Sequence, residues 1–344
     1  MVRMRVLVLG GSWFVGSGVV RAAVARGDEV WVFNRGVTPA VFPAGVEVVH
    51  GDRTRGEDLA ALAGHGPWDV VVDVAGAVPA QVRDAALALS PVCSRWVFVS
   101  SVSAYTGWPD EAVDETSAVY AADPDAEGAP EGVDGPVAYG MLKAGCEAAV
   151  RREFGPGRTI VLRPSVVLGP GEYVGRLPWW LDRARRGGRI LAPGRPDRVI
   201  QPVDVDDLAA FALWAGENAP GGVYDVAMPE GCATFGSLLR TCLEVTGSTG
   251  ALEWVDEGWL QRQPVRQWTE IPLWRPQPGT WAVDTSRARA QGLVCRPVED
   301  TVARVWDWLS SGGRPVSHPR RRDHGLDPAK EHRLLAAWDA LAGA

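Results

Sequence analysis

Short apolar runs alternate with amphipathic segments along the first half of the chain. The first run, residues 4–9, combines aliphatic and β-branched side chains, as expected for a strand buried on both faces of a parallel sheet. A glycine-rich turn follows, then residues 17–26 with helical periodicity and a second apolar strand at 29–33. Strand, turn, helix and strand within about 30 residues indicate a βαβ unit.

The same pattern continues beyond this unit. Further strands are predicted at residues 46–49, 69–74 and 96–99, and helices at residues 206–217 and 327–341. Asp327 followed by Pro328 is typical of a helix N-cap with proline in the first turn. Strands that alternate with helices predict an α/β fold with a parallel sheet. A chain of 344 residues can form a large core and two lobes.

The turn after the first strand has the composition of a dinucleotide-binding turn. Glycines let the backbone turn tightly and approach a pyrophosphate, whose charge is met by the N-terminus of the following helix. Gly10 and Gly16 occupy the first and third glycine positions, but Trp13 replaces the middle one. Trp13 therefore either points away from the cofactor or shields one side of it. The turn residues predicted to contact the cofactor are Gly10, Gly11, Ser12, Phe14, Val15 and Gly16.

The residues at the end of the second predicted strand indicate which dinucleotide binds. An NAD-binding turn places an Asp or Glu there to accept the ribose 2′-hydroxyl. This chain has Asn34 and Arg35 instead. A guanidinium pairs with a 2′-phosphate that a carboxylate would repel. We therefore predict NADP in preference to NAD, with both residues at the cofactor; the alternative is that Arg35 is a solvated loop residue.

A tyrosine and a lysine four residues apart, Tyr139 and Lys143, are the candidate chemical groups. Residues i and i+4 share one face of a helix, so an ammonium would lie beside a phenol. An unperturbed phenol titrates near ~10, and a neighbouring cation favours its deprotonated form. The pair is thus suited to proton transfer at neutral pH. Taken alone, the spacing could equally arise by chance on a surface helix.

These motifs, in this order, resemble the extended short-chain dehydrogenases/reductases, also described as the NAD-dependent epimerase/dehydratase family. The resemblance runs from residue 4 to about residue 310. Three further motifs follow predicted strands: Gly51-Asp52-Arg53, Ala75-Gly76, and Ser100 to Tyr105. Two more are Leu162-Arg163-Pro164 through Gly171, and Val203 to Ala209.

The resemblance implies a Rossmann-type doubly wound parallel sheet with a smaller C-terminal substrate-binding lobe. It assigns residues 1–164 plus 199–228 to the dinucleotide-binding domain and 165–198 plus 229–312 to the substrate lobe, leaving 313–344 as a basic linker and a C-terminal helix. The catalytic residues it implies are Ser101, Tyr139 and Lys143. The cofactor contacts that it adds are Asp52, Arg53, Ala75, Gly76, Tyr139, Lys143 and Pro164. The substrate contacts that it implies are Ser103, Trp179, Trp180 and Gln201.

The activity expected from the resemblance is NAD(P)-dependent oxidation or reduction at a secondary alcohol or ketone of a small molecule, with Tyr139 as general acid/base. An epimerase acting through a transient keto intermediate on a sugar or sugar nucleotide is the alternative. Val166 and Ile200 weigh against it, because sugar-nucleotide epimerases of the family typically have an Asn and an Arg there. Val102 and Ser103 replace the Asp-Glu pair of the family's dehydratases.

A third hypothesis is a non-catalytic nucleotide- or RNA-binding protein on the same fold. The turn without a middle glycine resembles that of chloroplast stem-loop RNA-binding relatives. A net charge of −7 argues against a nucleic-acid partner.

Composition indicates the redox compartment and bears on whether a metal site or a membrane span is expected. Five cysteines without a Cys-x-x-Cys spacing predict free thiols in a reducing cytoplasm. The five histidines are scattered, so no metal site is expected, and no apolar stretch approaches the ~20 residues of a membrane span. The sequence leaves open whether the protein is a homodimer.

Overall fold

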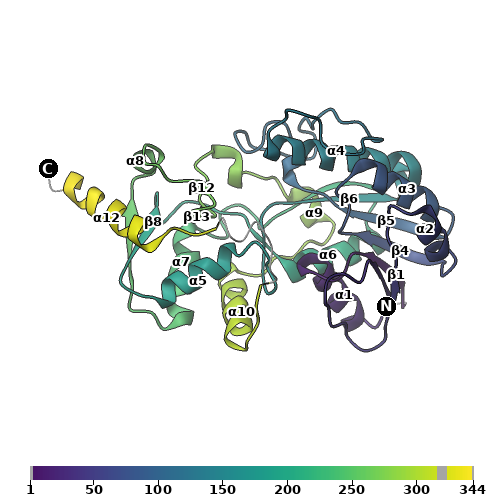
Figure 1. Cartoon of the computed structure of the whole chain (residues 1–344), viewed down its shortest axis with the longest axis horizontal. Coiled ribbons are helices and arrows are strands. Elements are labelled where there is room, and N and C mark those ends of the chain that lie inside the picture. The colour runs from purple at the N-terminus through teal and green to yellow at the C-terminus, as the bar shows by residue number, and fades with distance from the viewer. Residues whose placement is uncertain (1–2, 316–323, 343–344) are drawn as a thin grey trace.

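A seven-stranded parallel sheet lies at the centre of the computed structural model, which describes residues 3–315 and 324–342 (Figure 1). The strands run in the spatial order β10-β6-β5-β4-β1-β2-β3. Their bounds are β1 (Arg5–Leu9), β2 (Glu29–Asn34), β3 (Val46–His50), β4 (Trp68–Asp73), β5 (Cys93–Val99), β6 (Thr159–Pro164) and β10 (Gly222–Val226). The chain winds outward from β1 to β3 and then returns to β4 on the other side of β1. The Rossmann-type doubly wound sheet is therefore confirmed, and ligands of such sheets bind where the winding direction changes.

Helices cover both faces of this sheet. Alternate side chains of β1 enter two different cores: Val6 and Val8 pack beneath α1 (Phe14–Ala25) and α6 (Val205–Asn218). Leu7 and Leu9 pack beneath the helices of the opposite face, α2 (Gly56–Ala63), α3 (Pro79–Leu89) and α4 (Gly135–Phe154). Burial on both faces explains why these strands are apolar without alternation.

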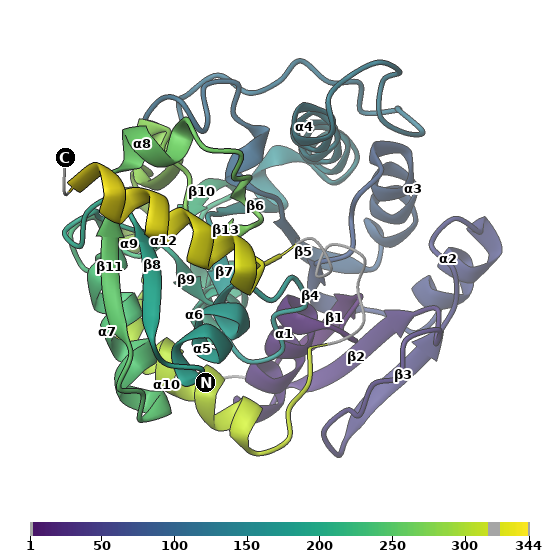
Figure 2. The same cartoon turned by 60° about the vertical axis from the view of Figure 1, so that its left-hand side comes forward.

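A second hydrophobic core lies beside the sheet, toward the C-terminal end of the molecule (Figure 2). We refer to the elements around it as the second-core region. Its helices are α5 (Arg176–Arg185), α7 (Phe235–Thr246), α8 (Glu257–Gln261), α10 (Val298–Ser310) and α12 (Pro328–Ala342). Its short strands are β8 (Arg189–Pro193) with β11 (Ala251–Val255), and β12 (Gln267–Trp268) with β13 (Ile271–Pro272). The β7 (Val167–Leu168) and β9 (Val203–Asp204) strands pair nearby, and α9 (Ser286–Ala290) packs against β10.

The C-terminal helix, α12, packs on the second-core region. The Glu331 carboxylate is buried, where it accepts hydrogen bonds from the Arg183 Nε at 2.8 and 2.9 Å and from the Leu191 backbone N–H at 3.1 Å. Trp338 lies 5.4 Å from Trp259, measured between ring centroids. The helix is thus part of the fold.

The predicted elements differ from the observed ones mainly at their ends. The first helix begins at Phe14, three residues earlier than predicted, because the glycine turn leads directly into helical backbone. The β5 strand begins at Cys93, since its polar first residues still pair with β4. All five cysteines are free, as predicted. Most of the basic segment expected after residue 313 falls on residues 316–323, outside the described residues.

Candidate active site

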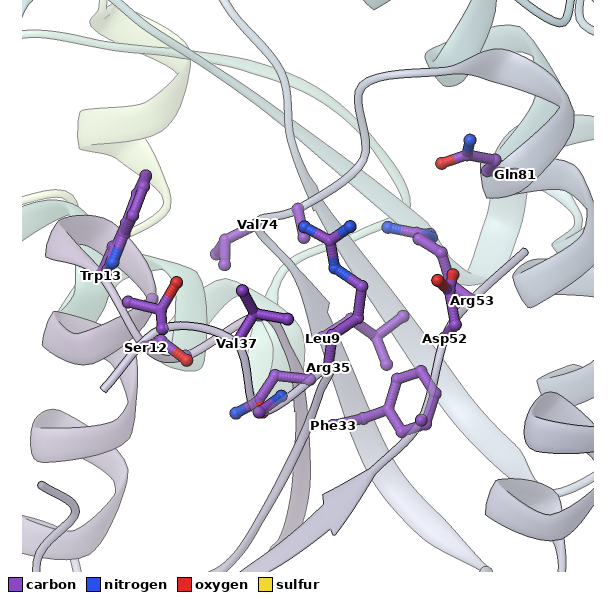
Figure 3. A pocket seen from close by; sticks show the side chains of 18 of the residues that line it. Leu9, Ser12, Trp13, Phe33, Arg35, Val37, Asp52, Arg53, Val74 and Gln81 are labelled. Carbon is purple, nitrogen blue, oxygen red and sulfur yellow. The ribbon is translucent and has the colours of Figure 1, made fainter. Parts of the chain in front are cut away.

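A cavity of about 560 Å³ opens at the carboxyl ends of β1, β2 and β3. Figure 3 shows Ser12 and Trp13 at one end of it and Asp52, Arg53 and Gln81 at the other. Its size is that of an ordinary small-molecule site, for which about 300–1,000 Å³ is usual. The cavity occupies the place where a doubly wound sheet binds its ligand.

The glycine turn fits a pyrophosphate. Gly10 and Gly11 have φ of +117° and +84°, which side chains other than glycine rarely adopt. A Cβ on Gly16 would lie 2.6 Å from the Gly11 backbone nitrogen, so helix and turn can approach closely only with glycine there. The α1 helix has no side-chain cap and no acidic residue in its first turn. Its first N–H groups are therefore available for an anion.

Residues at the tip of β2 form one wall of the cavity. The Asn34 Oδ1 accepts a hydrogen bond from the Gly36 backbone N–H at 2.8 Å and lies 3.1 Å from the His50 Nδ1. Arg35 lines the cavity, and its guanidinium makes no ion pair within the part of the chain that the structure describes. The Asp52 carboxylate accepts hydrogen bonds from the Thr54 N–H and hydroxyl, which lower its pKa. A cation and an anion thus face the cavity from neighbouring strands.

A buried ion pair supports the end of the cavity that is lined by Asp52 and Arg53. Arg53 donates two hydrogen bonds to Asp73, at 2.8 and 3.1 Å, and the Asp73 side chain is fully buried. Asp73 also accepts the Ala75 backbone N–H at 3.0 Å. Arg53 therefore holds the end of β4 while lining the cavity itself.

The candidate chemical residues lie on two segments that contact each other, α4 and the turn after β5. A Cβ on Gly140 would lie only 2.2 Å from the Ser103 carbonyl oxygen, so glycine allows this close contact. Tyr139, the residue before Gly140, is 45% exposed. The Ser101 Oγ accepts a hydrogen bond from the Ser103 N–H at 3.1 Å, which caps a short 3₁₀ helix, Val102–Ala104. The structure thus brings Ser101, Ser103 and Tyr139 to the same junction.

Lys143 is fixed in place by backbone groups. Its side chain is buried, and its Nζ donates to the Gly76 carbonyl at 2.8 Å and to the Val99 carbonyl at 2.9 Å. An ammonium has three donors, so one is left for another acceptor. The ammonium also lies 4.9 Å from the centre of the Phe98 ring. Lys143 thereby joins α4 to the ends of β4 and β5.

The Glu147 carboxylate connects α4 with residues at the ends of β5 and β6. Glu147, one turn beyond Lys143 on α4, accepts hydrogen bonds from the Ser100 hydroxyl at 2.5 Å and from the Arg163 Nε at 2.9 Å. Both members of the Glu147–Arg163 pair are buried. Their bonds fix α4 against the ends of β5 and β6.

The predicted cofactor residues divide into two groups. Those that line the cavity are Gly10, Gly11, Ser12, Phe14, Val15, Gly16, Asn34, Arg35, Asp52, Arg53 and Ala75. Those outside its lining are Gly76, Tyr139, Lys143 and Pro164. Lys143 is bonded to Gly76, and Pro164 ends β6.

Three residues predicted to contact substrate, Trp179, Trp180 and Gln201, have partners within the protein. Trp180 is buried in the second core and donates its indole N–H to the Pro272 carbonyl at 2.8 Å. Trp179 packs edge-on against Trp180. Gln201 is fully buried, and its amide bonds the Met228 carbonyl and both backbone groups of Val283.

Sequence reasoning missed several residues around the site. Gln81 and Tyr173 line the cavity, although only the position of Tyr173 after a Gly-Pro-Gly stretch could have drawn attention to it. The Arg275 guanidinium lies 4.7 Å from the Trp108 ring centre and 5.3 Å from that of Trp268. It forms no side-chain hydrogen bond with any described residue, and burial lowers its pKa. Trp268 has φ of +67°, a strained conformation for an aromatic residue.

Asp225, on β10, is a buried carboxyl group from which we expect a pH-dependent contribution to stability. The carboxyl group is fully buried and accepts the Tyr105 hydroxyl at 2.8 and 3.0 Å, and burial raises its pKa to about 8. In the unfolded chain the group titrates near ~3.9. Between these values the native state holds a proton that the unfolded state lacks, so the free energy of unfolding decreases as pH rises from about 4 to about 8.

We expect Asp225→Asn, which is neutral at every pH, to weaken this dependence. Urea unfolding at pH 5 and at pH 8 should show a smaller loss of stability in the variant than in the wild type. Equal losses in both proteins would show that Asp225 is ionised in the native state.

The described residues include neither a candidate membrane span nor a candidate metal cluster. None of the helices traced in residues 3–315 and 324–342 is long and apolar enough to cross a membrane. The same residues contain no cluster of three or more His, Cys, Asp or Glu side chains suited to a metal ion.

Comparison with known proteins gives several relatives. The chain is 36% identical over 234 residues to a 2′-dehydrokanamycin reductase of Streptomyces kanamyceticus, covering 65% of this chain and 62% of that protein. It is 24% identical over 258 residues to a chloroplast stem-loop binding protein of Arabidopsis thaliana, covering 71% of this chain and 63% of that protein. The chain thus matches a little under two thirds of the length of these two relatives.

A solved structure shares the fold of this chain, and a family model matches its sequence. The Bordetella bronchiseptica enzyme WbmG, solved in complex with NAD and UDP, superposes with a TM-score of 0.67 at 20% identity, covering 92% of this chain and all of that one. The sequence model of the NAD dependent epimerase/dehydratase family matches residues 6–227. The chain therefore belongs to the NAD dependent epimerase/dehydratase family.

Proposed function

We propose that this protein is an NAD(P)-dependent oxidoreductase that interconverts a secondary alcohol and a ketone on a small molecule. The cavity beside the glycine turn is the dinucleotide site, and the junction of α4 with the turn after β5 is the reaction site. The bound nicotinamide supplies or accepts the hydride, and the chain supplies position and proton.

Each residue at the junction has a separate role in this proposal. The Tyr139 hydroxyl exchanges the proton with the reacting oxygen, and its exposure leaves it accessible to a substrate. The Lys143 ammonium favours the phenolate and has a donor left for the nicotinamide ribose. The Ser101 hydroxyl accepts a backbone N–H, so its own proton can be donated to the reacting oxygen.

The position of Lys143 carries this proposal. A lysine that only served solubility would be exposed, whereas Lys143 is buried and bonded to the backbone at the ends of β4 and β5. That place lies at the same edge of the sheet as the dinucleotide cavity, where the carboxyl ends of parallel strands meet.

A reduction assay tests the proposal directly. The relative named 2′-dehydrokanamycin reductase makes a ketone on an amino sugar the first substrate to try, followed by a panel of cyclic and sugar ketones. We expect oxidation of NADPH that depends on the ketone and yields the alcohol. Binding of NADPH with no turnover on any ketone or alcohol would instead favour a non-catalytic nucleotide-binding protein.

A sugar-nucleotide epimerase is the second candidate, and Arg275 is the observation that favours it. The Arg275 guanidinium lies near the Trp108 and Trp268 rings and makes no hydrogen bond or ion pair with a carboxylate among the described residues, so it is suited to a phosphate. UDP binding that is lost in Arg275→Ala would support the epimerase. An epimerase would also retain its cofactor through each cycle, whereas a reductase exchanges it.

We propose further that NADP is preferred, and we expect Arg35→Ala to weaken NADPH binding at least tenfold. Hydrogen bonds to charged groups contribute about 1.5–3 kcal/mol, and NADH lacks the 2′-phosphate that would receive them. Titration of both cofactors by tryptophan quenching measures the two Kd values. Arg240→Ala, which removes an exposed arginine of α7, is the matched control. Equal weakening of NADH and NADPH in Arg35→Ala would contradict the proposed contact.

A further inference from the structure

Trp13, which stands in place of the middle glycine, contacts a residue from a distant part of the sequence. Trp13, the N-cap residue of α1, lies 5.8 Å from Tyr173 between ring centroids, with the ring planes tilted by 37°. Phe14 meets the same tyrosine edge-on at 6.2 Å. Phe14 has φ of +30°, and such strain persists only where the surroundings hold the residue in place.

Tyr173 reaches this position from the second-core region. Every other described residue lining the dinucleotide cavity lies between residues 9 and 81. Its contact with Trp13 places the Tyr173 ring at the Trp13 end of the cavity. Figure 3 shows that Trp13 lies at the opposite end from Arg53 and Gln81.

The chain around Tyr173 is anchored. The buried Glu172 carboxylate accepts the backbone N–H groups of Arg176 at 3.0 Å and Leu177 at 3.1 Å, at the start of α5. Leu177 is itself part of the second core. Tyr173 is thus attached to the first turn of α5.

We propose that Trp13 and Tyr173 form an aromatic clamp that retains the dinucleotide. The inference rests on the proposed dinucleotide site and adds a contact from the second-core region to it. The two rings cover the bound cofactor beyond the pyrophosphate turn, on the side away from the adenine. The clamp slows cofactor release, and it replaces the open surface that a middle glycine would leave.

The test measures the rate at which NADPH dissociates from the protein. Stopped-flow displacement by excess NADP⁺ is followed through energy transfer from tryptophan, and the chain has 16 tryptophans, so the signal survives the loss of one. Tyr173→Leu and Trp13→Leu should each raise the dissociation rate about tenfold, the usual size of an aromatic stacking contribution to a bound nucleotide. Tyr173→Phe, which keeps the ring, should stay within about twofold of the wild type. Because the rings act as a pair, the double variant should dissociate no faster than either leucine variant.

Control variants distinguish a wrong clamp proposal from a misfolded variant and from a wrong proposed function. Trp214→Leu removes a half-exposed tryptophan of α6 outside the cavity and should leave the rate unchanged. If Tyr173→Leu does not fold, Tyr173→Phe and Trp13→Leu still give opposite expected results. Unchanged release from folded Trp13→Leu, or an effect of Tyr173→Phe as large as that of Trp13→Leu, would overturn the clamp alone. Failure of the wild type to bind either dinucleotide would overturn the proposed function together with the clamp.

Discussion

Tyr139→Phe is expected to lower kcat by about 10²- to 10⁴-fold, the usual contribution of a positioned general acid/base. The variant loses only the hydroxyl that transfers the proton. Lys143 keeps its two backbone acceptors, and the cavity lining does not include Tyr139. The Kd for NADPH should therefore stay essentially unchanged, so that the loss is in the chemical step. Steady-state kinetics with the first ketone that the protein reduces, combined with NADPH titration, measures both quantities.

The control for this experiment is a tyrosine outside the junction. Tyr224→Phe removes a phenol hydroxyl of β10, which donates to the Pro220 carbonyl at 2.8 Å, and we expect it to retain most of the activity. If Tyr139→Phe also reduced the ketone at a near-normal rate, the proton would have to come from another group, and Tyr139 would lose its proposed role.

Glu147→Ala is expected to reduce the free energy of unfolding by about 3–5 kcal/mol, the usual cost of removing one partner of a buried ion pair. The substitution leaves the buried Arg163 guanidinium without its carboxylate and the Ser100 hydroxyl without its acceptor. Urea unfolding of the purified variant measures the effect. Because Glu147 connects α4 with the ends of β5 and β6, the remaining folded protein should also be less active.

Two further variants define what the carboxylate contributes. Glu147→Gln keeps hydrogen-bonding atoms but removes the charge, and it should fall between the wild type and the alanine variant. Glu244→Ala removes an exposed glutamate of α7 and should change stability by less than about 0.5 kcal/mol. A Glu147→Ala protein as stable as Glu244→Ala would mean that the buried pair is not formed in solution.

The sheet and the glycine turn could be predicted from sequence because both depend on local patterns. The apolar run of β1 has the signature of a strand buried on both faces, and Gly10 and Gly16 stand at the spacing that a tight strand-to-helix turn requires. The tyrosine–lysine pair could be found because four residues make about one helical turn.

The remaining features depend on contacts between distant segments. Tyr173 reaches Trp13, and Arg275 reaches Trp108, only because the second-core region folds back against the sheet. A resemblance in sequence placed Trp180 and Gln201 near the substrate, but it could not show that their polar groups bond to backbone. Burial and hydrogen-bond partners of that kind are visible only in three dimensions.

The central claim is that Lys143 and Tyr139 act together on a substrate beside a bound nicotinamide. The most direct measurement is a crystal structure of the protein grown with NADP⁺. We predict that the dinucleotide occupies the cavity between the glycine turn and Arg35, with the Lys143 Nζ bonded to the nicotinamide ribose and the Tyr139 hydroxyl on the same side of the ring. A nicotinamide bound away from both side chains, or crystals in which NADP⁺ does not bind at all, would contradict the account.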